Sequence, residues 1–287
     1  MKILTDCAAD LSPEEAQSMG IMVAPLYIQF AGEEINSADL TPDEFYDRLQ
    51  AVAPKIPTTA QPSAGIFADL YRKLTDAGEK VLSIHISSGL SGTIDSARMG
   101  AKEASDADVT IFDSMTLSGA QRFQVLAAAL AAKAGWAKDA ILSRLEKIRE
   151  STEVIYTLET LEYLAHGGRI GRVQALAGSL LKIKPVIRVD RSDGKYSTVG
   201  KARTLKSTMT MMAEHLASMY GSENPMWVSV MHGQLAEKAE EFAEMLKERM
   251  NIAKLEILRI SPVLGVHTGP GIVGATVTPM NLMEGFG

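Results

Sequence analysis

Short apolar runs rich in β-branched residues alternate with amphipathic segments along the first half of the chain. Residues 2–6, 80–87 and 108–113 have the composition of buried strands. The segments between them place apolar residues at helical spacing, as in 13–20 and 41–52. Strands that alternate with helices form a mostly parallel sheet that helices cover on both faces. The pattern therefore predicts an α/β fold.

Helix boundaries in this half carry clear signals. The segment 41–52 begins with a capping box, with Thr41 at the cap, Pro42 at the first helical position and Glu44 reaching back. Further helices are expected from about Pro62 to Ala77, after Gly92, and as a pair between Gly119 and Glu150.

The pattern changes after Ser151. Two short helices are expected around 160–168 and 172–181, and then two strands on either side of the turn signal Ser192–Lys195. Alternation then returns, with a Met-rich helix over 205–220, a strand over 226–232, a charged helix over 235–249 and a strand over 254–261. We therefore place a domain boundary near Ser151, which divides the chain into two α/β domains, 1–151 and 152–287.

Charge and composition exclude several classes of protein. The 287 residues carry a formal net charge of −6, and their lysines and arginines are scattered singly, so a nucleic-acid partner is not expected. Cys7 is the one cysteine, which excludes an intramolecular disulfide and a cysteine cage for a metal; no metal and no cofactor are expected.

The chain is also expected to stay out of the membrane. Asp6 comes too early for the apolar core of a secretory signal, so a reducing cytoplasm is the expected location. The apolar run 125–132 lies between Arg122 and Lys133 and is much shorter than the roughly 20 residues that span a bilayer. It is expected to form a buried helix.

Four loops after strands or before helices are rich in hydroxyl groups and glycine: 5–10, 57–63, 87–93 and 113–121. In an α/β protein such loops converge at one edge of the sheet, together with the free N–H groups of helix amino ends. The hydroxyls of Ser88, Ser91 and Thr93 are placed to surround an anion, although Ser and Gly also serve ordinary turns.

Two further polar segments allow similar alternatives. Thr58 and Thr59 precede a helix, where hydroxyl groups also serve as caps. Arg169 and Arg172 lie in the glycine-rich segment 166–172, where Arg169 is placed to bind a carboxylate or phosphate, or simply to follow a helix end on the surface.

Among the five histidines, His267 has the most suggestive context. It lies in "SPVLGVHTGPGIVG" (261–274), where it follows a strand, precedes Thr268, and is followed by glycines that let the backbone turn inward. Each of the others has a structural explanation: His85 and His232 in strands as core or rim residues, and His166 and His215 on helices as exposed residues.

Motifs for nucleotide, zinc or flavin chemistry are absent from the sequence. No G-x-x-x-x-G-K-[ST], H-E-x-x-H or G-x-S-x-G occurs. A binding protein and an enzyme are therefore both open. The enzymatic alternative is a serine acyl-hydrolase or acyltransferase with Ser91 as nucleophile, His267 as base and Asp113 as orienter, although nothing in the sequence supports the sharp turn that such a nucleophile needs.

Taken together, six segments resemble the blocks of the DegV family in their order along nearly the whole chain. They are TDCAADL (5–11), PTTAQPS (57–63), SSGLSGT followed by SA (87–97), TLEYLAHGGRIG (160–171), LLKIKPVI (180–187) and SPVLGVHTGPGIVG (261–274). Characterised members of this family are fatty-acid-binding subunits of the bacterial fatty acid kinase system.

The resemblance implies two α/β domains with a fatty acid between them, its chain in an apolar tunnel. It implies that the carboxylate is bound by Thr59, Ser91, Arg169, His267 and Thr268. It also implies a non-catalytic subunit that presents the acid to a separate ATP-dependent kinase, with Arg203 meeting that partner. One departure is Cys7, which stands where the family usually has a serine. Another amphipathic carboxylate or a lipid phosphate remains an alternative ligand.

Overall fold

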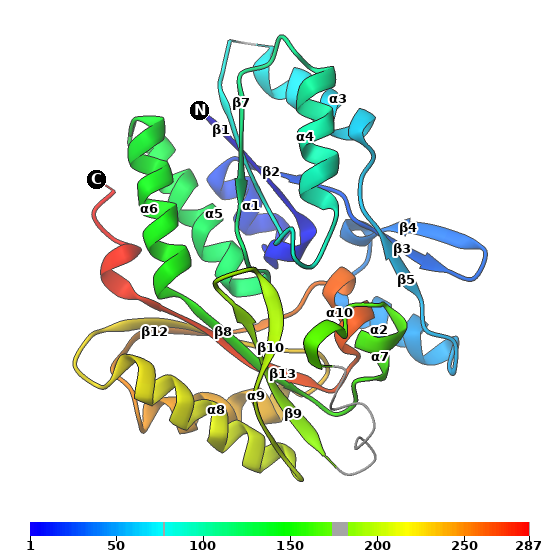
Figure 1. Ribbon diagram of the computed structural model, residues 1–287, viewed down its shortest axis with the longest axis vertical. Coiled ribbons are helices and arrows are strands. Elements are labelled where there is room, and N and C mark those ends of the chain that lie inside the picture. Colours follow the sequence, from blue (N-terminus) through cyan, green and yellow to red (C-terminus); the bar gives the residue numbers. More distant parts are fainter. Residues whose placement is uncertain (77, 174–182, 287) are drawn as a thin grey trace.

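The computed structural model describes residues 1–76, 78–173 and 183–286. Most of the helix expected over 172–181 lies outside these residues. The described chain forms two large sheets, with one layer of helices between them and one outside each (Figure 1).

The first sheet has four strands, all parallel, in the order β2-β1-β6-β7. Their bounds are Ile21–Ala24, Lys2–Asp6, Val81–His85 and Val109–Asp113. Helices α3 (Ala64–Thr75) and α4 (Thr93–Glu103) cover one face, and α5 (Ser118–Lys133) packs on the other. Two more helices, α1 (Pro13–Met19) and α6 (Lys138–Ser151), pack against α5. The predicted parallel sheet with helices on both faces is confirmed here.

The second sheet has six strands in the order β10-β9-β8-β13-β11-β12. Their bounds are Lys195–Ala202, Lys184–Asp190, Glu153–Leu158, Ile272–Pro279, Met226–His232 and Ile252–Arg259. Only β11 and β12 pair in parallel, so the expectation of mostly parallel sheets is wrong for this one. The tight turn between β9 and β10 makes a hairpin, which is antiparallel by necessity. Helices α8 (Leu205–Tyr220) and α9 (Ala236–Lys247) cover its outer face.

A smaller group of elements lies beside the two large sheets. It contains the sheet β4-β3-β5 together with α2, α7 and α10 (Figure 1). Their bounds are Glu33–Asn36, Tyr27–Phe30, Thr58–Ala60, Pro42–Ala51, Glu162–His166 and Pro262–Thr268. The predicted capping box of α2 is present, with Thr41 and Glu44 bonded in both directions. Three short 3-10 helices, Cys7–Ala9, Ser37–Asp39 and Met280–Leu282, complete the described elements.

Helix α5 lies between the two large sheets and contacts both β1 and β13. Its segment 125–132 is almost entirely buried, as expected for the apolar run. Gly119 lets the amino end of α5 approach the second sheet, because a Cβ at this position would lie 2.7 Å from Thr276 Oγ1. The layers are therefore closest where α5 begins.

The predicted domain segments 1–151 and 152–287 each supply the strands of one large sheet. Packing nevertheless crosses that division. Helix α10 packs against α2, β3 and β5, and Met283 and Phe286 join the core cluster that contains α5 and α6. Residues of the two halves therefore pack into the same hydrophobic core.

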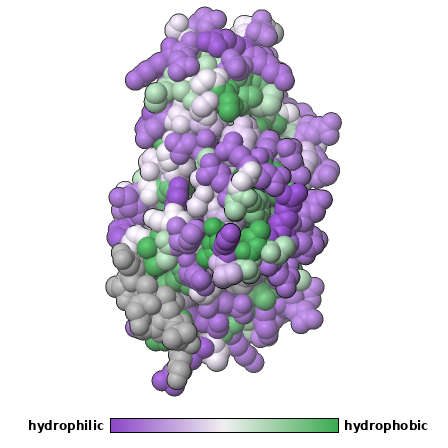
Figure 2. All heavy atoms as spheres, turned by 90° about the vertical axis from the view of Figure 1, so that its right-hand side faces the viewer, coloured by the Kyte–Doolittle hydropathy of each residue, from purple (hydrophilic) through white to green (hydrophobic). Residues whose placement is uncertain are grey.

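Figure 2 shows the face that carries the small sheet, where hydrophilic residues predominate around a smaller group of hydrophobic ones. In the part of the chain that the structure describes, no helix is both long and apolar enough to cross a membrane.

Arg122 on α5 links three elements through ion pairs. It bonds Glu15 of α1 and Glu256 of β12, and its side chain is only 5% exposed. Glu256 also accepts hydrogen bonds from Ser229 and Trp227. Removing one partner of a buried ion pair leaves a buried charge without compensation.

We predict that Arg122→Leu lowers the free energy of unfolding by about 3 kcal/mol, because it leaves two half-buried carboxylates without their cation. Urea denaturation measures this change. The matched control is Arg98→Leu, which removes an exposed arginine paired with Asp95 on α4; it should change stability by less than about 0.5 kcal/mol. Equal effects of the two substitutions would contradict a structural role for the Arg122 pairs.

Candidate functional site

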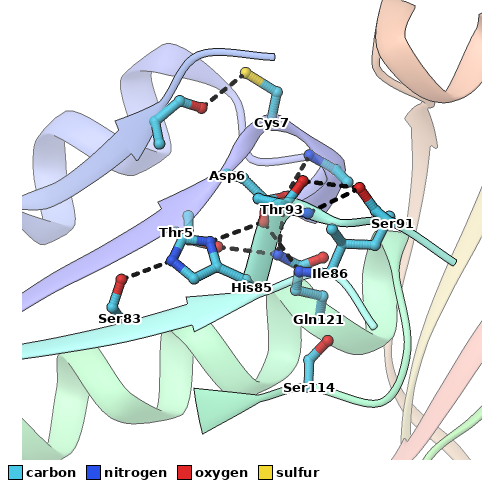
Figure 3. Close-up of polar contacts among 12 residues, drawn as sticks. Thr5, Asp6, Cys7, Ser83, His85, Ile86, Ser91, Thr93, Ser114 and Gln121 are labelled. Carbon is cyan, nitrogen blue, oxygen red and sulfur yellow. Dashed lines mark hydrogen bonds and ion pairs between the residues drawn. The ribbon is translucent and has the colours of Figure 1, made fainter. Parts of the chain in front are cut away.

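The carboxyl ends of β1, β6 and β7 meet at one edge of the first sheet, and Asp6 at the end of β1 joins β6 and α5 there (Figure 3). This side chain is fully buried. It accepts hydrogen bonds from the backbone N–H of Ala8 (3.0 Å) and Ile86 (2.9 Å), from Gln121 Nε2 (3.2 Å) and from His85 Nδ1 (3.0 Å). The loop after β1, the loop after β6 and the start of α5 are therefore held by one carboxylate.

His85 is a core histidine, as predicted. Its Nε2 lies 2.6 Å from Ser83 Oγ, which lies 3.0 Å from Tyr71 Oη. The row Ser83–His85–Asp6 has the order of a hydrolase triad, but all three side chains are fully buried (Figure 3). Because no substrate can reach this row, its role is to hold the loops in place.

The loop 86–92 is held by the second sheet as well. Ser87 Oγ donates to the carbonyl of Gly194 (2.8 Å) in the β9–β10 turn. Gly194 has φ +65°, and a Cβ there would lie 2.0 Å from Ser87 Oγ, so this contact requires glycine. Ser91 Oγ lies 2.8 Å from Thr93 Oγ1 at the start of α4. The loop thus positions Ser91 between the two sheets.

Thr59 and His267, which are 208 residues apart in the sequence, meet in a hydrogen bond of 2.8 Å between Thr59 Oγ1 and His267 Nε2. Thr59 lies in strand β5 rather than in a cap, since Ser63 caps the following helix. His267 lies in helix α10, which the sequence did not predict, and the glycine-rich turn follows it at residues 270–271. Gly167 is required beside it, because a Cβ there would lie 2.2 Å from His267 Nδ1.

Burial lowers the pKa of His267, and the nearby Arg169 and His166 act in the same direction, so that the pKa falls to about 4 in all. With this pKa the ring is neutral at physiological pH. Arg169 is half-buried and donates from Nη1 to the carbonyl of Gly167 at 2.6 Å. Thr268 Oγ1 donates to the carbonyl of Leu264 at 3.0 Å, so its proton already serves the helix.

One cavity brings these groups together. Thr59, Ser91, Arg169, His267 and Thr268 all line it, so the structure places every predicted ligand-binding residue at the same cavity. Its empty volume, including its opening, is about 860 Å³. Most of the remaining wall is apolar, and includes Leu26, Ile86, Leu117, Met231, Ile260 and Leu264. Arg169 is the one lining residue with a permanent charge among those the structure describes.

Five polar lining residues were not predicted as site residues: Gln61, Ser118, Tyr156, Tyr196 and Thr276. Gln61 lies within the block 57–63, and a Cβ at Gly92 would lie 2.7 Å from its Nε2. Tyr156 and Tyr196 lie in strands β8 and β10, where nothing in the sequence indicates which face points to the cavity.

The triad proposed for an acyl-hydrolase is not assembled. Ser91 bonds Thr93, and Asp113 accepts the backbone N–H groups of Ser88 (3.3 Å) and Met115 (2.9 Å). His267 bonds Thr59, and its Nδ1 has no partner among the described residues. No hydrogen bond joins any two of Ser91, His267 and Asp113, so the hydrolase alternative gains no support.

Cys7 and Arg203 do not line the cavity. The Cys7 thiol donates to the carbonyl of Ala24 at 3.4 Å, and burial raises its pKa to about 12, which keeps it protonated. Arg203 is exposed just before α8, whose cap is Thr204. His166 is exposed as predicted, whereas His215 is not: its side chain is 24% exposed and lies 3.6 Å from the buried Glu153.

Asp10 joins three segments and does not itself line the cavity. It accepts from Ser118 Oγ (2.5 Å) at the start of α5 and from the backbone N–H of Ser261 (2.7 Å) at the start of α10. Both Asp10 (φ 51°) and Ser118 (φ 55°) adopt left-handed backbone conformations. Burial raises the pKa of Asp10 to about 6.

Comparison with protein families gives a match to residues 1–280, to a model described as an uncharacterised protein of the DegV family. A DegV domain-containing protein of Deinococcus radiodurans is 35% identical over 277 residues, which cover 96% of this chain and 95% of the relative. A DegV domain-containing protein of Clostridium perfringens is 34% identical over 281 residues, or 96% of this chain and 97% of the relative.

Solved structures give the same fold. A fatty-acid-binding DegV family protein from Thermus thermophilus superposes with a TM-score of 0.89 at 30% identity, covering 97% of this chain and 99% of that one. A stearic-acid-binding protein from Eubacterium ventriosum superposes with a TM-score of 0.86 at 28% identity, covering 97% and 98%. The α/β class predicted from the sequence is therefore confirmed.

Two buried groups should give stability opposite dependences on pH. The folded chain holds the pKa of His267 near 4 instead of 6.5, so protonation favours the unfolded chain as the pH falls through that window. It holds the pKa of Asp10 near 6 instead of 3.8, so protonation there favours the folded chain. We predict that Asp10→Asn loses about 5 kcal/mol of stability relative to His267→Gln between pH 7 and pH 4, because the variant that keeps His267 loses stability as the pH falls while the variant that keeps Asp10 gains it.

The measurement is the difference between the unfolding free energies of the two variants at each pH, because other titrating groups are common to both. Parallel curves for Asp10→Asn and His267→Gln would contradict the prediction.

Proposed function

The chain belongs to the DegV family, and from this premise we propose that it binds a long-chain fatty acid and presents the carboxylate to a separate ATP-dependent kinase. The observation that carries the proposal is the distribution of polar and apolar residues along the cavity wall. Thr59, Ser91, Arg169 and His267 gather at an otherwise largely apolar wall. A fatty acid has the same two parts, one charged end and a long hydrocarbon chain.

Magnitudes separate the roles of the two parts of the ligand. Burial of about fifteen methylenes at roughly 0.8 kcal/mol each contributes on the order of 12 kcal/mol before costs. A hydrogen bond to the carboxylate contributes only about 1.5 to 3 kcal/mol, and burial of the charge costs several. The tail therefore sets affinity, and the polar end sets orientation.

The polar end works through one cation and neutral donors. Arg169 supplies the positive charge, because His267 is neutral. When His267 Nε2 carries the ring proton, it donates to Thr59 Oγ1 across the 2.8 Å bond and leaves the Thr59 hydroxyl free to donate to the carboxylate. His267 then acts by orienting Thr59, and the Ser91 hydroxyl adds a second neutral donor. Thr268 lines the same wall, with its own proton donated to the carbonyl of Leu264.

A partner must supply the phosphoryl group, because the sequence contains no nucleotide-binding motif. We place that partner's contact at Arg203, which is exposed and lies outside the cavity. The product would be an acyl phosphate whose chain stays buried, away from water and membranes. We further propose that the protein lies in the cytoplasm. Its segments 1–151 and 152–287 are then two domains that enclose the ligand.

Solvent extraction of the purified protein, followed by mass spectrometry, should release a fatty acid in a ratio near one per chain. The apolar lining should retain such a ligand through purification. Protein stripped of lipid should bind added stearic acid again, as measured by displacement of a fluorescent fatty acid. The proposed function fails if no acid is extracted and none binds when added.

Arg203→Ala should leave fatty acid binding unchanged and reduce acyl phosphate formation at least tenfold in an assay with the kinase and ATP, because a contact of about 1.4 kcal/mol or more is lost. Lys206→Ala, another exposed cation close by on α8, is the matched control and should have little effect. Loss of fatty acid binding in Arg203→Ala would move this residue into the binding site and overturn its assignment to the partner.

A further inference from the structure

We infer that the cavity takes an acyl chain that carries an oxygen, as a hydroxyl or a carbonyl group, away from its carboxylate end. The inference rests on the proposed function and names a narrower class of ligand. It comes from a second polar station in the cavity wall, formed by Tyr156, Thr276 and the first turn of α5, which the binding of a plain hydrocarbon chain does not use.

Strand register places Thr276 away from the carboxylate end. Ile272, Gly274 and Thr276 alternate along β13 and all line the cavity. Ile272 follows α10 closely, so its end of the strand is the one near His267. Thr276 is four residues further along, which is about 13 Å at the rise of an extended strand.

Tyr156 lies on the same face of the sheet, opposite Gly274 on the neighbouring strand β8. Tyr156 and Thr276 are then diagonal neighbours across an antiparallel pair. The close approach needs Gly274, since a Cβ there would lie 2.6 Å from the Cβ of Tyr156.

Both hydroxyls are buried without a hydrogen-bond partner among the described residues. Tyr156 is 4% exposed and Thr276 is fully buried, and neither Tyr156 Oη nor Thr276 Oγ1 has a partner. Burial raises the pKa of Tyr156 well above 10, and the neighbouring Tyr196 hydroxyl raises it further, so the Tyr156 hydroxyl keeps its proton and can donate. A buried hydroxyl without a partner costs free energy, and a ligand oxygen would recover it.

The first turn of α5 adds donors at the same place. No side chain caps this helix, and Leu117 and Ser118 line the cavity at its amino end. Thr276 Oγ1 packs directly on Gly119 in that turn. Uncapped N–H groups at a helix amino end favour an oxygen with partial negative charge. A hydroxyl or carbonyl oxygen suits these donors, whereas a methylene group leaves them unsatisfied.

The experiment compares stearic acid with a set of hydroxystearic acids that carry the hydroxyl at successive positions along the chain. Affinities are measured by displacement of a fluorescent fatty acid from lipid-free protein. At one or two adjacent positions, the hydroxy acid should bind about five- to tenfold more tightly than stearic acid, which is the effect of one net hydrogen bond in a buried site.

Two near-isosteric variants locate the effect. Thr276→Val should reduce the ratio of the affinities for the hydroxy acid and stearic acid to about one, and Tyr156→Phe should also reduce this ratio. Both variants should bind stearic acid at least as tightly as the unsubstituted protein does. The matched control is Thr157→Val. Thr157 is also fully buried and its hydroxyl also has no partner among the described residues, but it does not line the cavity. This control should keep the full preference.

The outcomes separate the inference from the proposed function. If stearic acid binds and no hydroxy acid binds more tightly, the inference is overturned and the proposed function stands. A preference that survives in both Thr276→Val and Tyr156→Phe also overturns it, because the oxygen then lies elsewhere. If no acid binds at all, both the inference and the proposed function are wrong. Thermal melting of each variant establishes that it is folded.

Discussion

The buried carboxylate of Asp6 is the interaction on which the site depends. A charged group without solvent must have its oxygens satisfied, and Asp6 achieves this with donors from the loop after β1, the end of β6, the loop that follows it and α5. Those segments cannot move independently without breaking one of the bonds. The loop that carries Ser91 and the helix that forms the cavity wall are therefore positioned by a residue that does not itself line the cavity.

The second sheet and helix α10 also position residues of the site. The Ser87–Gly194 bond holds the serine loop from the other side, and α10 brings His267 to Thr59. The result is a polar end whose single permanent charge is Arg169, with a neutral histidine that orients a hydroxyl. Such an arrangement suits a carboxylate, which is what the proposed function requires.

Local structure was largely predictable from the sequence. The helix at 205–220 and the strand at 226–232 have the predicted bounds, and the capping box of α2 is present. Strand direction in the second sheet was not predictable, because a buried apolar run looks the same whether its neighbours are parallel or antiparallel. The helix α10 was also missed, because seven residues are too few to show a clear helical pattern.

By itself, the sequence determined the periodic elements, the hydroxyl-rich loops and the chemical types available for an anion. Only the tertiary structure decided which of these meet: Thr59 with His267 across 208 residues, Gly167 against the imidazole, and Cys7 turned away toward Ala24. It also decided that Tyr156 and Thr276 face the cavity while Thr157 does not. The physical reason is that these contacts depend on strand pairing and side-chain direction, which packing between distant segments sets and local spacing does not.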